Sequence, residues 1–314
     1  MKKILSLTLI FTLVFGLVGC GNNNSTGNKN TEDETVTITH QFGETEVAVN
    51  PKKIAVFDLG ILDILDFVGI EVGALPSASL PEYLSKFDSS QYIKVGSMKE
   101  VDYDALSDYS PDLIIISGRL ADAYEELSEI APTIFFQSPG ATYFETLEEN
   151  VNILQKVFPD KADAFNKELT NIKRNLANLS SEAVESGLNA LVLLANDGSL
   201  SVYGAGSRYG VIHDGFDFVE ADDTIVSSTH GQEASFEYIV EVNPDILFVV
   251  DRSAAIGSDG ATGAATLLDN DLVNSTKAAT NNKIVYLSSD VWYLVMGGFT
   301  GTNQMIDEVA VALD

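Results

Sequence analysis

A single cysteine, Cys20, occurs in the 314 residues, so the chain forms no internal disulfide and no site that needs several thiolate ligands. Only three histidines are present, and a metal site built from protein ligands alone requires three or four suitable side chains. Positive charge is equally scarce, because 46 Asp and Glu residues face 18 Lys and Arg and give a net charge of −28. A field of this sign disfavours nucleic acids and anionic lipid surfaces, and an anionic ligand would need local positive charge to overcome it.

The amino-terminal segment begins MKKILSLTLIFTLVFGLVGCGNNN, in which an apolar run over residues 4–18 follows two lysines. The run is short for a membrane span of about 20 residues, which favours an export signal over the alternative of an anchor helix. Its end, Leu-Val-Gly-Cys at 17–20, resembles the lipobox of bacterial lipoproteins. That resemblance implies a signal peptide at 1–19, cleavage before Cys20, and lipidation of Cys20 at the outer face of the bacterial cytoplasmic membrane. Loss of Lys2 and Lys3 with the signal would bring the net charge to −30.

Residues 20–35 comprise the lipidated Cys20 and a polar stretch with no apolar residue able to start a core. We predict a flexible tether there, with a root-mean-square reach of about 20 Å by random-coil scaling. The globular part is expected to begin near Val36.

Short, continuous apolar runs alternate with helical patterns through the rest of the chain and indicate an α/β fold. Such runs suit strands of mainly parallel sheets covered by helices on both faces. We predict strands at 54–57, 113–117, 133–136, 190–195, 200–204, 246–250 and 283–287.

A region without strand signal, 143–180, separates two sets of strands. Its apolar residues repeat every three or four positions on either side of Pro159, which predicts two helices or one long helix kinked at the proline. We expect this helical bridge to join an N-terminal lobe at 36–142 to a similar C-terminal lobe at 181–314. Packing of the helices within a single domain is the alternative.

An internal repeat supports the two-lobed arrangement. The stretch DYDALSDYSPDLIIISGR at 102–119 aligns without gaps with SFEYIVEVNPDILFVVDR at 235–252, at a constant offset of 133 residues. In each copy a short helix ends at Pro-Asp, an apolar strand follows, and an arginine comes at its carboxyl end, Arg119 or Arg252. Ligand crevices in open α/β sheets lie outside the carboxyl ends of the strands, so both arginines are expected to point into a cleft between the lobes.

A third arginine, Arg208, lies in the loop-like sequence SVYGAGSRYGVIHD, and only Arg174 falls on the helical segment. The planar donor fork of arginine suits carboxylate, phosphate or catecholate oxygens and stacks on aromatic rings. Three loop arginines therefore indicate an oxyanion-rich ligand, with ordinary surface salt bridges as the alternative. The glycines of this loop follow a G-x-G-x-x-x-G spacing without the context of a dinucleotide site, so we expect them to shape a turn that presents Arg208.

Few other residues are candidates for a site. His230 lies in a loop of small residues where an imidazole can face a ligand, whereas His40 and His213 are expected to be structural. We expect Trp292 in the core or in the wall of the cleft, and the phenolate of Tyr293 is a hard oxygen donor that suits Fe³⁺. No Ser-His-acid grouping, carboxylate pair or phosphate loop stands out, so we predict a binding protein rather than an enzyme.

The motifs YGAGSRYGVIHD, THGQEASFEYIVEVNPDILFVVDR, VWYL and DYDALSDYSPDLIIISGR together resemble the lipoprotein solute-binding components of bacterial iron-siderophore ABC importers. The likeness is to binders of the petrobactin, anguibactin and enterobactin type. It implies a class III periplasmic-binding-protein fold, in which a long helix joins two α/β lobes and limits their closure. It also implies a monomer without a permanent cofactor, whose transported ligand is a ferric catecholate-type, petrobactin-like siderophore.

The resemblance also implies roles for the residues that match the motifs. Arg119, Arg208 and Arg252 would form an arginine triad around the ferric complex, with aromatic packing from Trp292. His230 and Tyr293 would be iron ligands where the siderophore supplies only four donors.

Docking on the membrane partner is implied in the same way. Asp104 and Glu237, one acidic residue per lobe, would contact arginines of an ABC permease that is driven by a separate ATPase. The first position carries Asp where the family pattern has Glu.

Three other functions are compatible with these residues. Haem or a hydroxamate siderophore would suit the same fold, with Tyr293 or His230 as an iron ligand, although the two propionates of haem do not obviously require three arginines. A secreted hydrolase of ferric siderophores would need an activated nucleophile. An adhesion lipoprotein would bind no such ligand, so reversing the charge of the arginines would leave it unaffected.

Overall fold

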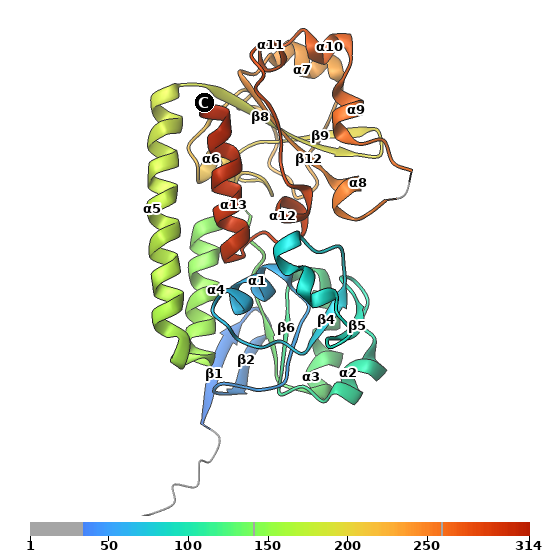
Figure 1. Cartoon of the computed structure of the whole chain (residues 1–314), viewed down its shortest axis with the longest axis vertical. Coiled ribbons are helices and arrows are strands. Elements are labelled where there is room, and N and C mark those ends of the chain that lie inside the picture. Colours follow the sequence, from blue (N-terminus) through green and yellow to red (C-terminus); the bar gives the residue numbers. More distant parts are fainter. Residues whose placement is uncertain (1–33, 141, 259) are drawn as a thin grey trace, which may run out of the picture. The chain divides into compact units, whose positions relative to one another are not determined.

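The computed structural model describes residues 34–140, 142–258 and 260–314 (Figure 1). The predicted signal peptide at 1–19, Cys20 and nearly all of the tether lie outside the described residues. Within the described ranges, no helix is both long enough and apolar enough to cross a membrane.

Five parallel strands form the N-terminal sheet, in the order β5-β4-β3-β6-β7 (Figure 1). Their bounds are β3 (Ile54–Val56), β4 (Ala74–Ser77), β5 (Ile93–Ser97), β6 (Leu113–Ile116) and β7 (Thr133–Phe135). The inner strands β3 and β6 are buried along their whole length, which explains why their sequences are continuous apolar runs. A hairpin of β1 (Thr35–His40) and β2 (Gly43–Ala48) precedes this sheet.

The C-terminal sheet is mixed, with the path β11-β9-β8-β12-β13 and β10 paired to β8. Its strands are β8 (Asn189–Asn196), β9 (Ser199–Tyr203), β10 (Val219–Glu220), β11 (Gln232–Ala234), β12 (Ile246–Asp251) and β13 (Ile284–Tyr286). Only β9 runs against its neighbours, β8 and β11. The reversal after β8 is the two-residue turn Asp197-Gly198, with φ of 47° and 82°, as in a type I′ hairpin. The predicted parallel arrangement therefore holds for the strands that lead to Arg119 and Arg252.

The two copies of the sequence repeat fold alike. The first copy forms α2 (Tyr103–Tyr109) and β6, and the second forms α7 (Phe236–Val242) and β12. Each helix begins at a residue whose side chain caps it, Asp102 or Ser235. Each helix ends at a left-handed residue, Ser110 or Asn243, with φ of 52° or 48°. Aligned residues thus start and stop the helix in the same way in both copies.

Two helices connect the sheets, α4 (Tyr143–Val157) and α5 (Ala162–Ser186), with the turn η3 (Pro159–Lys161) between them. The break falls at Pro159, as predicted, because proline lacks the N–H that would continue the helix. Helix α5 runs past the predicted boundary at 180 and ends at Gly187, whose φ is 61°. In Figure 1, α5 lies alongside α4 and α13 (Phe299–Ala310).

The remaining helices are shorter. They are α1 (Leu59–Phe67), α3 (Tyr124–Ile130), α6 (Val211–Asp214), α8 (Arg252–Ala255), α9 (Ala264–Leu268), α10 (Asp271–Asn274), α11 (Lys277–Thr280) and α12 (Ser289–Leu294). Short 3-10 helices are η1 (Glu82–Asp88), η2 (Gly118–Ala123) and η4 (Val311–Leu313).

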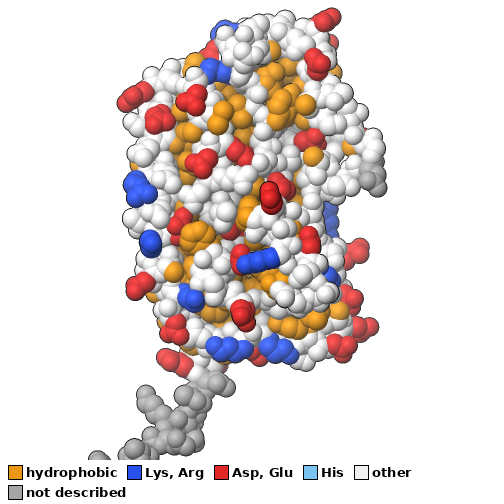
Figure 2. Space-filling model, in the orientation of Figure 1, with side chains coloured by type: hydrophobic (Ala, Val, Ile, Leu, Met, Phe, Trp, Pro, Cys, Tyr) orange, Lys and Arg blue, Asp and Glu red, His pale blue; other side chains and the backbone are white. Residues whose placement is uncertain are grey.

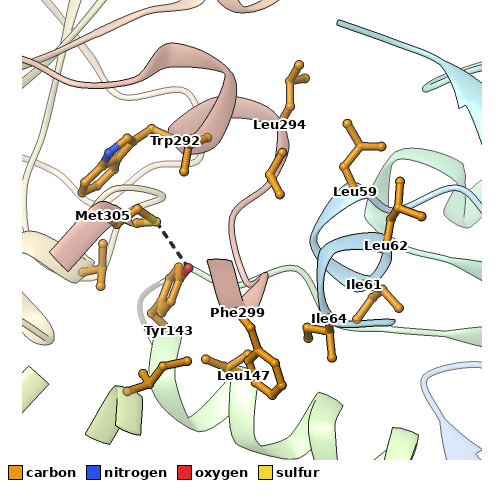
Figure 3. Packing of buried hydrophobic residues seen from close by; sticks show 14 of the residues in the cluster. Leu59, Ile61, Leu62, Ile64, Tyr143, Leu147, Trp292, Leu294, Phe299 and Met305 are labelled. Carbon is orange, nitrogen blue, oxygen red and sulfur yellow. Dashed lines mark hydrogen bonds between the residues drawn. The ribbon is translucent and has the colours of Figure 1, made fainter. Parts of the chain in front are cut away.

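One buried apolar cluster is shared by the two sheets. It joins residues of both sheets to α1, α4, α5 and α13, and separate clusters cover the other face of each sheet. Figure 3 shows part of the shared cluster, with Leu59 and Leu62 of α1 and with Leu294 and Phe299 of the C-terminal segment. Each large apolar side chain buried there contributes about 1.5–3 kcal/mol to stability. The C-terminal segment is therefore held against a helix of the N-terminal lobe.

Candidate functional site

Tyr293 is the residue on which the three loop arginines converge. It lies near the end of α12, a helix of six residues whose last carbonyl groups have no partner further along the helix. Arg119 and Arg208 both donate from Nη2 to the Tyr293 carbonyl oxygen, at 3.0 and 2.8 Å. Arg252 donates from Nε to the Tyr293 hydroxyl at 2.9 Å. One residue thus gathers three guanidinium groups from distant parts of the sequence.

The arginines reach Tyr293 from the carboxyl ends of strands or from loops beyond them. Arg119 lies in η2 directly after β6, and Arg252 begins α8 directly after β12. Arg208 lies in the loop between β9 and α6. Its Cζ stacks 4.4 Å from the centroid of the Tyr293 ring, and Arg252 Cζ lies 5.6 Å from the same centroid.

The glycine-rich loop at 204–210 presents Arg208 and is not a dinucleotide turn. Strand β9 before it is antiparallel to its neighbours, and α6 after it has four residues, whereas a dinucleotide turn joins a parallel strand to a long helix. Gly206 has a φ of 72°, and a Cβ on Gly210 would lie 2.6 Å from an Asp214 carboxylate oxygen. The loop is therefore tight and depends on glycine at these positions.

A cavity of about 720 Å³ lies beside Tyr293. Arg119, Arg208, Tyr293 and the exposed His230 all line it. Its walls come from both halves of the chain, since the loop at 138–140 contributes on one side and the loops at 206–208 and 227–230 on the other. The sequence-predicted residues Arg119, Arg208, His230 and Tyr293 are thus brought together at one cavity.

Arg252 is placed differently, because it is not among the residues that line the cavity. Besides the Tyr293 hydroxyl, its guanidinium donates from Nη1 to Asn196 Oδ1 at 2.7 Å. Burial raises the pKa of the Tyr293 phenol, but the hydrogen bond from Arg252 and the charges of the three arginines outweigh burial and bring the pKa below its ordinary value. Arg252 therefore acts on the cavity through the phenol.

Asp58 is the acidic residue of the cavity wall. Its Oδ1 accepts from Ile61 N at 2.9 Å as the N-cap of α1, and its Oδ2 accepts from Ser117 Oγ at 2.5 Å. Burial lowers the pKa of Arg119, the charge of Asp58 raises it, and the charge of Arg208 lowers it again. An arginine has so high an ordinary pKa that Arg119 keeps its positive charge at neutral pH.

Lys99 is a lining residue that the sequence analysis missed. It lies in a tight turn in which Ser97 Oγ accepts from the backbone N–H groups of Lys99 and Glu100, at 3.2 and 3.1 Å. Within the described part of the chain, the Lys99 ammonium forms no salt bridge. Acidic side chains are spread over the face of the molecule in Figure 2, whereas the cavity gathers Lys99, Arg119 and Arg208 against Asp58. No sequence pattern sets this loop lysine apart from the others.

Trp292 is not among the residues that line the cavity, so the prediction that its ring packs against the ligand is wrong. Its side chain is 0% exposed, and its Nε1 donates to Glu308 Oε2 at 2.9 Å. The same oxygen accepts from Ser288 N at 3.0 Å, so Glu308 fixes the start of α12. Successive helical residues point about 100° apart, and on α12 it is Tyr293 that faces the cavity while Trp292 faces the core.

The other candidate residues lie away from the cavity. His213 is buried with Nδ1 3.0 Å from a backbone carbonyl oxygen, and His40 lies 2.9 Å from a threonine hydroxyl. Asp104 and Glu237 are exposed in the first turns of α2 and α7, and a second cavity of about 630 Å³ borders Asp104. Among the residues with described positions, no three His, Cys, Asp or Glu side chains are grouped to hold a metal ion.

Two α/β lobes with a cavity lined from both sides define a two-lobed solute-binding protein. The profile of the periplasmic binding protein family matches residues 54–291, and the chain belongs to this family. The predicted class III periplasmic-binding-protein fold is thereby confirmed.

Several relatives are similar over most of their length. The petrobactin-binding protein YclQ of Bacillus subtilis is 43% identical, with 100% of both chains covered. The ferric-anguibactin-binding protein FatB of Vibrio anguillarum is 29% identical over 87% of this chain and 86% of FatB. The crystal structure of YclQ has a TM-score of 0.86 at 44% identity, covering 90% of this chain and 99% of that one. The periplasmic catecholate-siderophore-binding protein VctP of Vibrio cholerae has a TM-score of 0.83 at 34% identity, covering 88% and 100%.

Proposed function

We propose that this protein is an extracytoplasmic lipoprotein that binds a ferric catecholate-type siderophore and delivers it to an ABC permease. The observation that carries the proposal is the convergence of Arg119, Arg208 and Arg252 on Tyr293 beside a cavity. The ligands named for the relatives, petrobactin, ferric anguibactin and catecholate siderophores, support it. The relatives are binding proteins, and we propose binding without catalysis for this chain as well.

The charge of the cavity suits such a ligand. A ferric tris-catecholate carries about three negative charges, and each charge-assisted hydrogen bond to it contributes about 1.5–3 kcal/mol. Lys99, Arg119 and Arg208 supply positive charge at the wall, and the Asp58 carboxylate is already engaged by Ile61 N and Ser117 Oγ. The cavity therefore provides local positive charge on a chain whose net charge is −28.

The arginines keep donors free for the ligand. Each guanidinium carries about five N–H donors, and within the described residues Arg119 and Arg208 each use one nitrogen on the Tyr293 carbonyl. A catecholate oxygen can thus bind to the remaining N–H groups while the Tyr293 carbonyl keeps both guanidiniums in place. This preorganisation lowers the cost of ordering two long side chains on binding.

The iron of a siderophore with only four donor atoms has room for two protein ligands. We propose His230 and Tyr293 for this role, because both line the cavity. The lowered pKa of the Tyr293 phenol also favours the phenolate form, which is the form that Fe³⁺ prefers as a ligand. Iron is here the cargo and not a resident cofactor.

Two further parts of the chain would attach the protein to the membrane and deliver the ligand to the permease. We propose that Cys20, which lies outside the described residues, carries the lipid that holds the protein at the outer face of the cytoplasmic membrane. Asp104 and Glu237 occupy equivalent positions in α2 and α7, which supports their docking as a pair on permease arginines. A separate ATPase would supply the energy for transport.

The soluble form that starts after Cys20, titrated with four ligands, tests the proposal. We expect ferric petrobactin and a ferric bis-catecholate to bind saturably, with a change in their visible charge-transfer band and an unchanged ligand mass after incubation. A ferric hydroxamate and haem should bind far more weakly. Preferential binding of haem, seen as a shifted Soret band, or of the hydroxamate would contradict the catecholate assignment and leave the fold assignment intact.

A further inference from the structure

A buried carboxylate, Asp63, joins helices α1 and α13. Asp63 lies in the middle of α1 and is 1% exposed. Its Oδ1 accepts from Thr300 N at 3.2 Å, and its Oδ2 accepts from Gly301 N at 2.8 Å, so that both oxygens bind the first turn of α13. The positive end of the α13 dipole and two charge-assisted hydrogen bonds favour an ionised carboxyl at this place.

The contact leaves no room for a side chain at Gly298. A Cβ on Gly298, the N-cap residue of α13, would overlap Asp63 Oδ2, so no side chain fits at the position that normally caps a helix. A Cβ on Gly301 would lie 3.5 Å from the same oxygen and 3.2 Å from the Tyr83 hydroxyl. Asp63 thus takes the place of the missing cap, although it comes from a different helix.

No cation compensates the charge of Asp63 within the described residues. On α1 its charged neighbour is Asp66, which pairs with Lys86 at the surface. The Tyr83 hydroxyl of η1 and the Tyr143 hydroxyl of α4 face the same region, and the Tyr83 hydroxyl has no hydrogen-bond partner in the described structure.

Two further acids, Asp290 of α12 and Glu308 of α13, are close enough to influence Tyr83. Among the described residues, the charged groups that act on Asp63 and Tyr83 are thus acids, and the lysine on Asp66 lies at the surface. A buried charge in such surroundings is costly, and a neutral side chain would serve stability better.

Both helices that Asp63 joins lead directly to the cavity. Helix α1 begins at Asp58, a wall residue five positions before Asp63. Helix α13 follows α12, which carries Tyr293, and the Tyr143 hydroxyl also accepts from Gly297 N in the connection between them, at 2.8 Å. A shift of the first turn of α13 would therefore move the carbonyl oxygen that holds Arg119 and Arg208.

We propose that Asp63 is a positioning residue for ligand binding, which ties the first turn of α13 to α1 and so fixes Tyr293 and the two guanidiniums bonded to its carbonyl oxygen. The inference rests on the proposed function, because it concerns the affinity for the ferric catecholate. The ionised carboxylate holds both backbone N–H groups firmly, whereas a neutral side chain holds them weakly. The cost of burying the charge is then a loss of stability that serves the geometry of the site.

The sign of the effect on stability follows from the pKa. Burial raises the pKa of Asp63 from 3.8 to about 6, against the lowering effect of the hydrogen bonds from Gly301 and Thr300. The folded protein binds this proton more tightly than the unfolded chain does, so the contribution of Asp63 to stability falls as the pH rises from about 4 to about 6 and is lowest above that range. Asp63→Asn should therefore be at least as stable as the wild type at pH 7.5.

The test compares wild type and Asp63→Asn for binding of a ferric bis-catecholate between pH 7.5 and 5. We expect the variant to bind about tenfold more weakly at pH 7.5, by the loss of one charge-assisted hydrogen bond, while its melting temperature is unchanged or higher. The ratio of the two affinities should fall toward one with a midpoint near pH 6, where wild-type Asp63 becomes neutral. Protonation of the ligand affects both proteins equally and cancels in this ratio.

Asp66→Asn is the matched control, since it removes one carboxylate from the same helix without a contact to α13, and it should bind like the wild type. Carbon-13 NMR of labelled carboxyl groups tests the wild type without any substitution. By linkage, ligand binding should lower the pKa of Asp63 by an amount that corresponds to the same tenfold factor.

A pH-independent affinity ratio, an unmoved Asp63 pKa on ligand binding, or parallel losses of stability and affinity in Asp63→Asn would overturn the inference and leave the proposed function intact. Absence of ferric catecholate binding by the wild type would overturn both.

Discussion

Arg208 offers the sharpest test of how the cavity binds its ligand, because its positive charge and its planar fork of donors can be removed separately. Its guanidinium donates to the Tyr293 carbonyl oxygen at 2.8 Å and stacks 4.4 Å from the Tyr293 ring centroid. Arg208→Lys keeps a positive charge but removes the planar donor fork, whereas Arg208→Ala removes both.

The expected losses follow from these contacts. Loss of one charge-assisted bond to the ligand costs about 1.5–3 kcal/mol, so Arg208→Ala should weaken binding of a ferric catecholate by about 10- to 150-fold. Arg208→Lys should lose mainly the stacking and the fixed geometry, at about 0.5–1 kcal/mol or about two- to fivefold. Arg119 still donates to the Tyr293 carbonyl oxygen in either variant, so the loss of stability should be about that of one hydrogen bond, roughly 0.5–1.5 kcal/mol.

Isothermal titration of the soluble form with a ferric bis-catecholate, at low and physiological salt, measures these losses. Arg174→Ala on the exposed face of α5 is the matched control, because it removes an arginine far from the cavity lining, and it should bind within twofold of the wild type. If Arg208→Ala also binds within twofold, the guanidinium does not hold the ligand. If Arg208→Lys loses as much as Arg208→Ala, charge contributes nothing measurable beyond geometry.

Three further results are expected. In an ultraviolet titration, the Tyr293 phenol should ionise at a lower pH in the wild type than in Arg252→Ala, because the hydrogen bond and the charge of Arg252 lower the pKa of the phenol. Coincident titration curves would show that the Arg252 hydrogen bond does not stabilise the phenolate. Glu308→Ala leaves the Trp292 indole N–H without its partner, so it should lower the free energy of unfolding by about 1–3 kcal/mol and shift the tryptophan emission. A urea midpoint equal to that of the wild type would contradict the assigned contact. Lys99→Ala should weaken ferric catecholate binding at low salt and less at high salt, where exposed charges are screened, and a difference independent of salt would exclude an electrostatic role.

Much of the scaffold could be predicted because the sequence signals were local and repeated. The apolar runs marked the buried parallel strands, and the repeat at an offset of 133 marked two units in which Arg119 and Arg252 follow equivalent strands. The antiparallel β9 was also within reach of the sequence, since Asp197-Gly198 is a typical hairpin turn between two apolar runs.

The residues that were missed depend on orientation in three dimensions. Trp292 and Tyr293 are adjacent, and only the rotation of α12 about its axis decides that the phenol faces the cavity and the indole faces the core. Lys99 reaches the cavity through the path of a turn that no spacing rule predicts. Asp63 did leave a signal, since it is an acid flanked by apolar residues in the helix LGILDILDF, but its partners on α13 lie more than 230 residues away.

Anomalous diffraction at the iron absorption edge, from crystals of the soluble form grown with a ferric bis-catecholate, locates the bound iron relative to the arginines. We predict one iron peak in the cavity, with catecholate oxygens within hydrogen-bond distance of Arg119 and Arg208 and with Tyr293 at or beside the metal. A bound ligand whose iron lies elsewhere, or a cavity in which the arginines make no contact with the ligand, would contradict this prediction.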